Sequence, residues 1–291
     1  MQCGTGCRFR SVGARLGLGL AALGRPGYLN VGHGAELGED TSVAALRART
    51  FEVLDHAYQA GVRDFDVARS YGRGEEFLGE WLRAHNPSGV HISSKWGYVY
   101  TAGWEIAHDP PEVKHHDVET FRRQLYETRE NLGEWLQLYQ IHSATPESGV
   151  LTDDEVLRAM QETDLPLGVS VSGTSQAQTI DLALTLGLFD AVQATWNLYE
   201  RAAEDALARA HAAGLRVYVK EALANGRLAG RDAEALAAAL AQPWATVVLS
   251  GAASIAVLES NLRARDTDPP DLGEPEASAA YWSRRASLAW N

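Results

Sequence analysis

Residues 166–195, PLGVSVSGTSQAQTIDLALTLGLFDAVQAT, hold one complete unit of the pattern that decides the fold. Apolar runs at 166–171 and 189–195 have the length of buried strands, and residues 175–187 between them have the length of a helix. Gly187 ends the helical stretch, where a left-handed cap is expected. A strand, a helix and a second strand in this order predict parallel strands joined by a right-handed crossover.

The same unit recurs eight times along the chain. The predicted strands are 14–20, 62–66, 89–94, 136–141, 166–171, 189–195, 215–220 and 245–250. The predicted helices are 42–60, 75–85, 117–132, 152–163, 175–187, 201–213, 231–241 and 254–265. Start signals support three of the helices, namely Thr41 with Ser42, a capping box of Thr152 and Glu155, and Ser254. Eight such units predict an α/β fold of the (β/α)8 TIM barrel type.

A single domain covering residues 1–291 is predicted, because no linker, charge run or shift of composition divides the chain. Three segments fall outside the repeat. Residues 1–12 are predicted to form a flexible N-terminal extension, residues 96–116 a long aromatic loop, and residues 266–291 a C-terminal tail over the barrel mouth. A loop as long as 96–116 within a compact domain is usually functional.

Composition and charge argue against several classes of protein. The net charge of −12 repels nucleic acid and anionic membrane surfaces, so neither is expected as a partner. No apolar stretch reaches the roughly 18 residues of a membrane span, and the cytoplasm is the expected location. The pair Cys3 and Cys7 is expected to be two free thiols. His108, His115 and His116 lack the ligand spacing of a metal site and are expected at the surface.

Four side chains suited to carbonyl chemistry, Asp66, Tyr71, Lys95 and His142, fall at or just past the ends of predicted strands. In a barrel of this kind they converge at the mouth formed by the C-terminal strand ends. A nearby ammonium favours the ionised form of a phenol and lowers its pKa, so Lys95 would make Tyr71 a better proton donor at neutral pH. Asp66 would hold Lys95 in place, and neutral His142 would donate a hydrogen bond to the carbonyl oxygen.

Each of these residues also has a purely structural interpretation. Asp66 could cap a helix or form a salt bridge, Tyr71 could belong to a turn, Lys95 could be solvated, and His142 could be a buried histidine with its hydrogen bonds satisfied. Perturbed titratable groups arise in structural networks as well as in active sites. Four suitable residues at neighbouring strand ends nevertheless favour the catalytic interpretation.

Several motifs, spread in order over nearly the whole chain, resemble those of the aldo-keto reductase superfamily. They are LGLGLAALG at 16–24, DVARSYGRGEEFLG at 66–79, SKW at 94–96, LYQIH at 138–142, GVS at 168–170, VQATWNL at 192–198, GRLAG at 226–230 and GAASIAVLESNL at 251–262. The resemblance implies a (β/α)8 barrel that reduces aldehydes or ketones with a nicotinamide cofactor. It also implies that Tyr71 is the proton donor, that Lys95 and Asp66 tune it, and that His142 positions the carbonyl.

The resemblance further implies where cofactor and substrate bind. The residues implied to bind the cofactor are Gly19, Asp66, Ser170, Gln193, Lys220, Leu223, Gly251, Ser254 and Asn261. Ser170 and Gln193 would hydrogen-bond the nicotinamide carboxamide, and the last helix would offer its first turn to a phosphate. Trp96, Tyr98 and Trp196 are the implied substrate-binding residues.

Three departures from the family pattern bear on the cofactor. Val171 stands where an asparagine is usual, and Lys220 stands where an aromatic residue usually stacks on the nicotinamide. The stem of Lys220 could cover the ring, its ammonium could reach a phosphate, or it could pair with Glu221. The basic residues that bind the 2′-phosphate of NADPH are missing from 251–257, so NAD(H) is expected nearly as strongly as NADP(H).

The aromatic residues Trp96, Tyr98, Tyr100 and Trp104 could form one wall of a pocket for an apolar or amphipathic substrate. They could equally pack their own loop onto the barrel. Trp196 could replace the missing aromatic platform, although a Trp near a strand end is more often packed in the core. Tyr281, Trp282 and Trp290 are expected to bring the tail back to the barrel.

The sequence therefore predicts an NAD(P)H-dependent oxidoreductase that reduces an aldehyde or ketone, or oxidises the corresponding alcohol or sugar. Two alternatives stay open, namely a nucleotide-binding regulatory barrel without turnover and a barrel lyase or isomerase without net redox chemistry. The binding partner is expected to be a small carbonyl or alcohol substrate. The sequence does not indicate whether the protein is a monomer or an oligomer.

Overall fold

The computed structural model describes residues 13–27, 40–106 and 108–288, and these contain the predicted closed barrel. The parallel strands pair in the order β1-β10-β9-β8-β7-β6-β3-β2. Their bounds are β1 Arg15–Gly19, β2 Asp64–Asp66, β3 His91–Trp96, β6 Leu136–Ala144, β7 Leu167–Val171, β8 Ala191–Thr195, β9 Arg216–Lys220 and β10 Val247–Ser250. The barrel closes where β1 pairs with β10 on one side and with β2 on the other.

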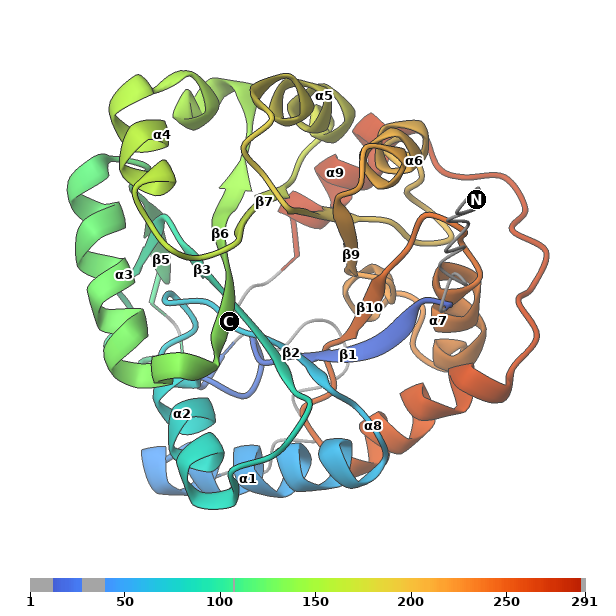
Figure 1. Cartoon of the computed structure of the whole chain (residues 1–291). Helices are drawn as coiled ribbons and strands as arrows, with labels where there is room; N and C mark the ends of the chain where they lie inside the picture. Colours follow the sequence, from blue (N-terminus) through green and yellow to red (C-terminus); the bar gives the residue numbers. More distant parts are fainter. Residues whose placement is uncertain (1–12, 28–39, 107, 289–291) are drawn as a thin grey trace, which may run out of the picture.

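Helices surround the barrel strands as an outer ring (Figure 1). Their bounds are α1 Val43–Gln59, α2 Gly74–His85, α3 Val118–Leu132, α4 Asp154–Gln161, α5 Gln176–Leu186, α6 Glu204–Ala212, α7 Asp232–Leu240 and α8 Ile255–Leu262. The predicted (β/α)8 fold is therefore confirmed, with element ends that differ by a few residues from the predicted ones.

Side-chain caps fix the beginnings of several helices. Ser42 accepts a hydrogen bond from the backbone N–H of Ala45 at 3.2 Å, and Ser254 accepts one from Val257 at 3.3 Å, as the sequence predicts. The predicted capping box of Thr152 and Glu155 is wrong. Asp153 caps α4 instead, because its carboxylate accepts from two backbone N–H groups of the first turn at 3.0 and 3.1 Å. A carboxylate at this position also interacts favourably with the helix dipole.

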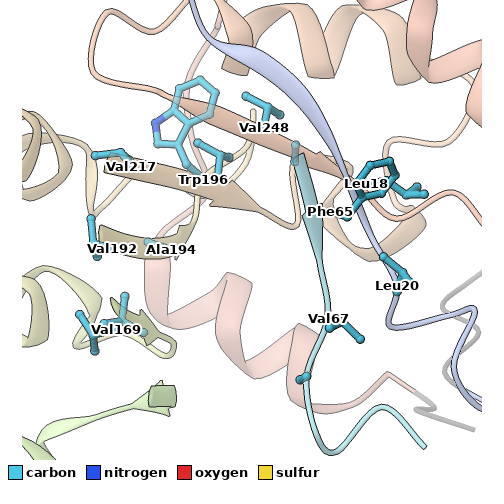
Figure 2. Close-up of a cluster of buried hydrophobic side chains, with 14 of the residues drawn as sticks. Leu18, Leu20, Phe65, Val67, Val169, Val192, Ala194, Trp196, Val217 and Val248 are labelled. Atoms are coloured by element: carbon cyan, nitrogen blue, oxygen red, sulfur yellow. The ribbon is translucent and has the colours of Figure 1, made fainter. Parts of the chain in front are cut away.

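Alternate residues along the strands face two separate apolar layers. Val169, Val192, Val217 and Val248 belong to the large core that lies between the barrel and its helices (Figure 2). A smaller cluster is formed by the residues that alternate with them: Leu138, Ala191, Tyr218, Val247 and Leu249. Because side chains along a strand alternate between its faces, this smaller cluster fills the barrel interior. Inward positions nearer the C-terminal strand ends are polar, and they form the site described below.

Part of the segment 96–116, which the sequence predicts as a long aromatic loop, has regular structure. It contains an antiparallel hairpin of β4 (Tyr98–Tyr100) and β5 (Glu112–Lys114). The pairing places Tyr98 opposite Lys114 and Tyr100 opposite Glu112, and two contacts tie the hairpin to the barrel. Arg25 donates to Glu112 at 3.2 Å, and the Lys114 ammonium donates to the Ser143 carbonyl at 2.9 Å.

The C-terminal tail returns to the barrel mouth and includes helix α9 (Ser278–Ala286) (Figure 1). Tyr281 is fully buried, and its hydroxyl accepts a hydrogen bond from the Asn197 amide at 3.0 Å. Trp282 packs against the core beside it, whereas Trp290, Cys3 and Cys7 lie outside the described residues. Within the described part of the chain, no helix has the length and apolarity needed to cross a bilayer.

Candidate active site

The Asp66 carboxylate lies at the centre of a polar layer inside the barrel. Asp66 is the last residue of β2, and its Oδ1 atom accepts hydrogen bonds from side chains of three other strands, β3, β6 and β8. The donors are Ser93 at 2.6 Å, Gln140 at 3.3 Å and Gln193 at 3.1 Å. Its other oxygen is ion-paired with the ammonium of Lys95 on β3. All five of these side chains are buried.

Lys95 joins Asp66 to Tyr71. Its ammonium donates to Asp66 and also to the Val67 carbonyl at 2.9 Å, and it lies 5.0 Å from the centroid of the Tyr71 ring. Burial lowers the pKa of Lys95, and the charge of Asp66 opposes that shift. We therefore infer that Asp66 maintains the ammonium form in a site that would otherwise disfavour it.

His142 completes the group from β6. Its ring lies edge-on to the Tyr71 ring with centroids 5.5 Å apart, and Tyr98 flanks its other side at 4.9 Å. Burial, followed by the charges of Lys95 and Lys220, holds the pKa of His142 well below its usual value. The imidazole is therefore neutral at pH 7.

A local irregularity in β6 sets the position of His142. The register of β6 against β7 shifts between Ile141 and Ala144, and Ser143 has a positive φ of 55°. Such a conformation is costly for a residue other than glycine, and it is concentrated at functional sites. The imidazole of His116 supports the backbone at the same position, because it hydrogen-bonds the His142 carbonyl through Nε2 at 2.9 Å. His116 is thus partly buried against the site, although the sequence predicts a surface residue.

Two residues that the sequence interpretation missed position this group. Gly24 packs so tightly under the Tyr71 loop that a Cβ atom would lie 2.1 Å from the Tyr71 carbonyl. Glu75 of α2 is buried and accepts hydrogen bonds from Ser94 at 2.6 Å and Thr128 at 2.8 Å. Both lie within quoted motifs, but only the tertiary contacts show what they do.

A cavity of about 760 Å³ opens over these residues, a size that suits a small-molecule ligand. Asp66, Tyr71, Tyr98 and His142 line it. Six of the predicted cofactor-binding residues other than Asp66 also line it: Gly19, Gln193, Lys220, Leu223, Gly251 and Asn261. Two do not: Ser170 is fully buried in β7, and the Ser254 hydroxyl caps α8.

Comparison with known protein families identifies the family to which this barrel belongs. The family model described as "Aldo/keto reductase family" matches residues 15–243. The chain belongs to the aldo/keto reductase family. None of the curated proteins compared with it matches this chain.

Solved structures of other aldo-keto reductases share the fold of this family member at low sequence identity. The holo form of a Bacillus halodurans aldo-keto reductase is 18% identical with a TM-score of 0.68, over 93% of this chain and 91% of that one. A glycerol dehydrogenase from Gluconobacter oxydans is 19% identical with a TM-score of 0.65, over 94% and 90%. A Klebsiella pneumoniae aldo-keto reductase in complex with NADPH is 22% identical with a TM-score of 0.60, over 88% and 86%.

Two aromatic residues predicted to bind substrate lie elsewhere in this aldo/keto reductase. Trp96 is fully buried and packs edge-on against Phe121, with ring centroids 5.0 Å apart. Trp196 is also fully buried, packs against Trp244, and donates from its indole N–H to Glu204 at 3.0 Å (Figure 2). Neither lines the cavity, because both side chains face the helices and not the barrel interior.

Most of the aromatic residues predicted to form a wall of the pocket do not line the cavity. Trp104 points to the start of α1, where its indole N–H donates to the Thr41 carbonyl at 2.8 Å, and the Tyr100 hydroxyl accepts from the Trp104 backbone. Of the four aromatic residues proposed as a wall, Tyr98 alone lines the described cavity. The other lining residues are largely polar or charged, which disagrees with the prediction of an apolar pocket.

One charged cluster at the mouth joins β9 to the C-terminal helix of this aldo/keto reductase. Glu221 follows β9 with a positive φ of 57° and accepts from the Arg285 guanidinium at 2.9 and 3.1 Å. Lys220, the last residue of β9, approaches Glu221 to 3.7 Å. Burial lowers the pKa of Lys220 to about 8, whereas Arg285 and Lys220 lower the pKa of Glu221 to about 2 against the effect of its own burial.

Proposed function

We propose that this chain is an NAD(P)H-dependent reductase of aldehydes or ketones, which also oxidises the corresponding alcohol or sugar, with Tyr71 as its proton donor. The observation that carries the proposal is the arrangement at the cavity floor. Tyr71 and His142 line one cavity, and the Lys95 ammonium lies 5.0 Å from the Tyr71 ring while paired with Asp66. Membership of the aldo/keto reductase family supports the oxidoreductase class.

Unsatisfied polar atoms beside the cavity support a nicotinamide cofactor, which when bound supplies the hydride. The Ser170 hydroxyl and the Asn261 Oδ1 atom are buried without a hydrogen-bond partner among the described residues. A buried polar group without a partner is costly, so a ligand that supplies partners is favoured. In this proposal Asn261, Gly251 and the first turn of α8 hold the nucleotide end, and Gln193 with Ser170 holds the nicotinamide end.

The residues of the chain itself handle the proton. The Tyr71 hydroxyl donates its proton to the carbonyl oxygen, and the ammonium of Lys95 stabilises the phenolate that remains. Asp66 keeps Lys95 charged and fixed. Neutral His142 has one ring N–H, which it donates to the same carbonyl oxygen, so the oxygen is polarised before the hydride arrives.

The identity of the nucleotide is proposed as NADP(H) or NAD(H). The Klebsiella pneumoniae aldo-keto reductase binds NADPH, which favours the first. Against it, Gly251, Ala252, Ala253 and Val257 offer no cation for a 2′-phosphate. Michaelis constants for the two nucleotides decide between them, and tighter use of NADPH by tenfold or more would exclude a preference for NADH.

The experiment that tests the proposal compares the wild type with Lys95→Met. The wild-type protein should consume NADPH or NADH only when an aldehyde or ketone is added. Removing the ammonium should lower kcat by roughly 10²- to 10⁴-fold, the usual contribution of general acid catalysis. In the reverse reaction, alcohol oxidation, the loss should be smallest at high pH, where Tyr71 ionises without help and can accept the alcohol proton. Tryptophan fluorescence should still report cofactor binding, because Lys95 lies behind Tyr71 and does not line the cavity. A wild-type protein that consumes no cofactor with any carbonyl would contradict the proposal.

A further inference from the structure

The cations of the cavity wall differ in how fully their hydrogen-bond donors are used. Arg25 donates to the Ser70 carbonyl at 3.3 Å and to Glu112 at 3.2 Å. Arg285 donates hydrogen bonds to the Glu221 carboxylate from two of its nitrogens. Lys220 is the third Lys or Arg in the described lining. No hydrogen bond joins its ammonium to any residue that the structure describes, and its nearest acid, Glu221, is 3.7 Å away.

Within the group formed by Lys220, Glu221 and Arg285, the charge of Lys220 is the one that is left over. Glu221 accepts from Arg285 at 2.9 and 3.1 Å and from the Asn225 amide at 3.2 Å, so its carboxylate is already paired. Glu221 and Arg285 cancel each other, and Lys220 then contributes one net positive charge to this wall. In a chain with a net charge of −12, a local cation with unused donors indicates a site for an anion.

Lys220 lies near the reacting group and not at a remote part of the cavity. It ends β9, in register with Thr195 of β8, two residues beyond Gln193, which donates to Asp66. Its charge lowers the pKa of His142, and in turn Lys95 and Asp66 both act on the pKa of Lys220. An anion held by Lys220 is therefore close to the carbonyl that Tyr71 and His142 address.

We propose that Lys220 anchors an anionic group of the substrate, so that the preferred substrates are aldehydes or ketones that carry a carboxylate or a phosphate. The inference rests on the proposed reductase function and adds the substrate class to it. The Glu221–Arg285 pair is the supporting element, because Arg285 prevents Glu221 from neutralising Lys220.

Matched pairs of substrates test the inference. Succinic semialdehyde is compared with butanal, and glycolaldehyde phosphate with glycolaldehyde, so that each pair differs in its anionic group and the two pairs separate carboxylate from phosphate. The wild type should favour the anionic member of at least one pair by roughly 10- to 100-fold in kcat/KM, the effect expected of one charge-assisted hydrogen bond.

Three variants identify the residue responsible. Lys220→Met should abolish the preference, because kcat/KM for the anionic member should fall toward that for the neutral member, mainly through KM. Lys220→Arg should retain much of the preference, because it keeps the charge. Arg285→Gln should weaken the preference without touching Lys220, because Glu221 is then free to pair with it.

Dependence on pH separates an electrostatic anchor from a structural role. The charged groups that act on Lys220 are Glu221, Arg285, Lys95 and Asp66, the neutral imidazole of His142 also lies close enough to interact with it, and burial lowers the pKa of Lys220 itself to about 8. The preference for the anionic member should therefore decline as pH rises through about 8 and should show no such step in Lys220→Arg.

Two results overturn the inference and leave the proposed function standing. One is a Lys220→Met variant that loses kcat/KM equally for both members of each pair. The other is a variant whose only change is weaker binding of NADPH or NADH, which would place the cofactor at Lys220. A wild type that reduces no aldehyde or ketone would instead overturn the proposed function, and the inference with it.

Discussion

At the level of single residues, the site depends on the hydrogen bonds and the ion pair made by the Asp66 carboxylate. Its carboxylate accepts from Ser93, Gln140 and Gln193 and pairs with Lys95, so every part of it is engaged inside the barrel. Removing one partner of a buried ion pair typically lowers the stability of the folded protein by about 3–5 kcal/mol, because the other charge is left buried without compensation. Asp66 therefore links stability to chemistry, since the contacts that satisfy it also fix Lys95 beside Tyr71.

Gly24 gives a prediction at the same scale. Substitution by alanine would place a Cβ atom 2.1 Å from the Tyr71 carbonyl and 2.8 Å from the Gly74 Cα, so the Tyr71 loop must move. We expect Gly24→Ala to lower the free energy of unfolding by about 1–3 kcal/mol, the usual cost of overpacking, and to reduce kcat at least tenfold. Urea denaturation and steady-state kinetics measure the two effects.

Gly13→Ala is the matched control, because a Cβ atom there meets nothing within 4 Å. It should change neither quantity. A Gly24→Ala protein with wild-type kcat would show that Gly24 does not position Tyr71.

Tyr71, Lys95 and His142 could be chosen from the sequence because their chemistry is specific and their place at strand ends is readable. Gly24 and Glu75 could not, because their roles depend on contacts between segments far apart in sequence. The prediction that Trp96 and Trp196 bind substrate was wrong for a related reason. Which side of a strand faces the barrel interior depends on register, and a shift of one residue exchanges the two faces.

At the scale of elements, the β4–β5 hairpin and α9 complete the mouth that the eight repeated units leave open. His116 follows the hairpin and packs against Gly97, with its Nε2 bonded to the His142 carbonyl. Its Nδ1 atom is buried without a partner among the described residues. Burial and the Lys114 charge lower the pKa of His116 to about 4. The hairpin is therefore attached to the barrel by a neutral histidine.

The attachment predicts a loss of stability in acid. The unfolded chain takes up a proton at His116 near pH 6.5, whereas the folded chain resists it until about pH 4, so stability falls as pH falls between these values. The contribution is about 3–4 kcal/mol at about 1.4 kcal/mol per pH unit. Urea denaturation of the wild type and of His116→Gln, at neutral pH and near pH 4, measures it.

His116→Gln keeps an N–H donor for the His142 carbonyl but cannot titrate. The variant should lose less stability in acid than the wild type, although His142 contributes a loss of the same sign in both proteins. Equal losses in the two proteins would assign the acid sensitivity to other groups.

At the scale of the whole molecule, the barrel follows from repetition and the pocket does not. Eight strand–helix units with recognisable caps predicted the closed parallel barrel, because such units leave few arrangements of the chain. The hairpin and α9 lie outside the repeat, and their sequences carry no comparable constraint. The polar character of the cavity comes mainly from the barrel strand ends and the segments that follow them. The predicted apolar wall was wrong because Trp96 faces the helices and Trp104 packs at the start of α1.

The central claim is that the Tyr71 phenol delivers the proton in a carbonyl reduction. It is tested most directly by comparing the wild type with Tyr71→Phe, since phenylalanine fills the same space without the hydroxyl. Cofactor binding is followed by quenching of tryptophan fluorescence, and turnover by carbonyl-dependent oxidation of the reduced nucleotide. We expect unchanged cofactor binding and a kcat lower by roughly 10²- to 10⁴-fold. A variant that binds the cofactor and keeps kcat within about threefold of the wild type would contradict this claim.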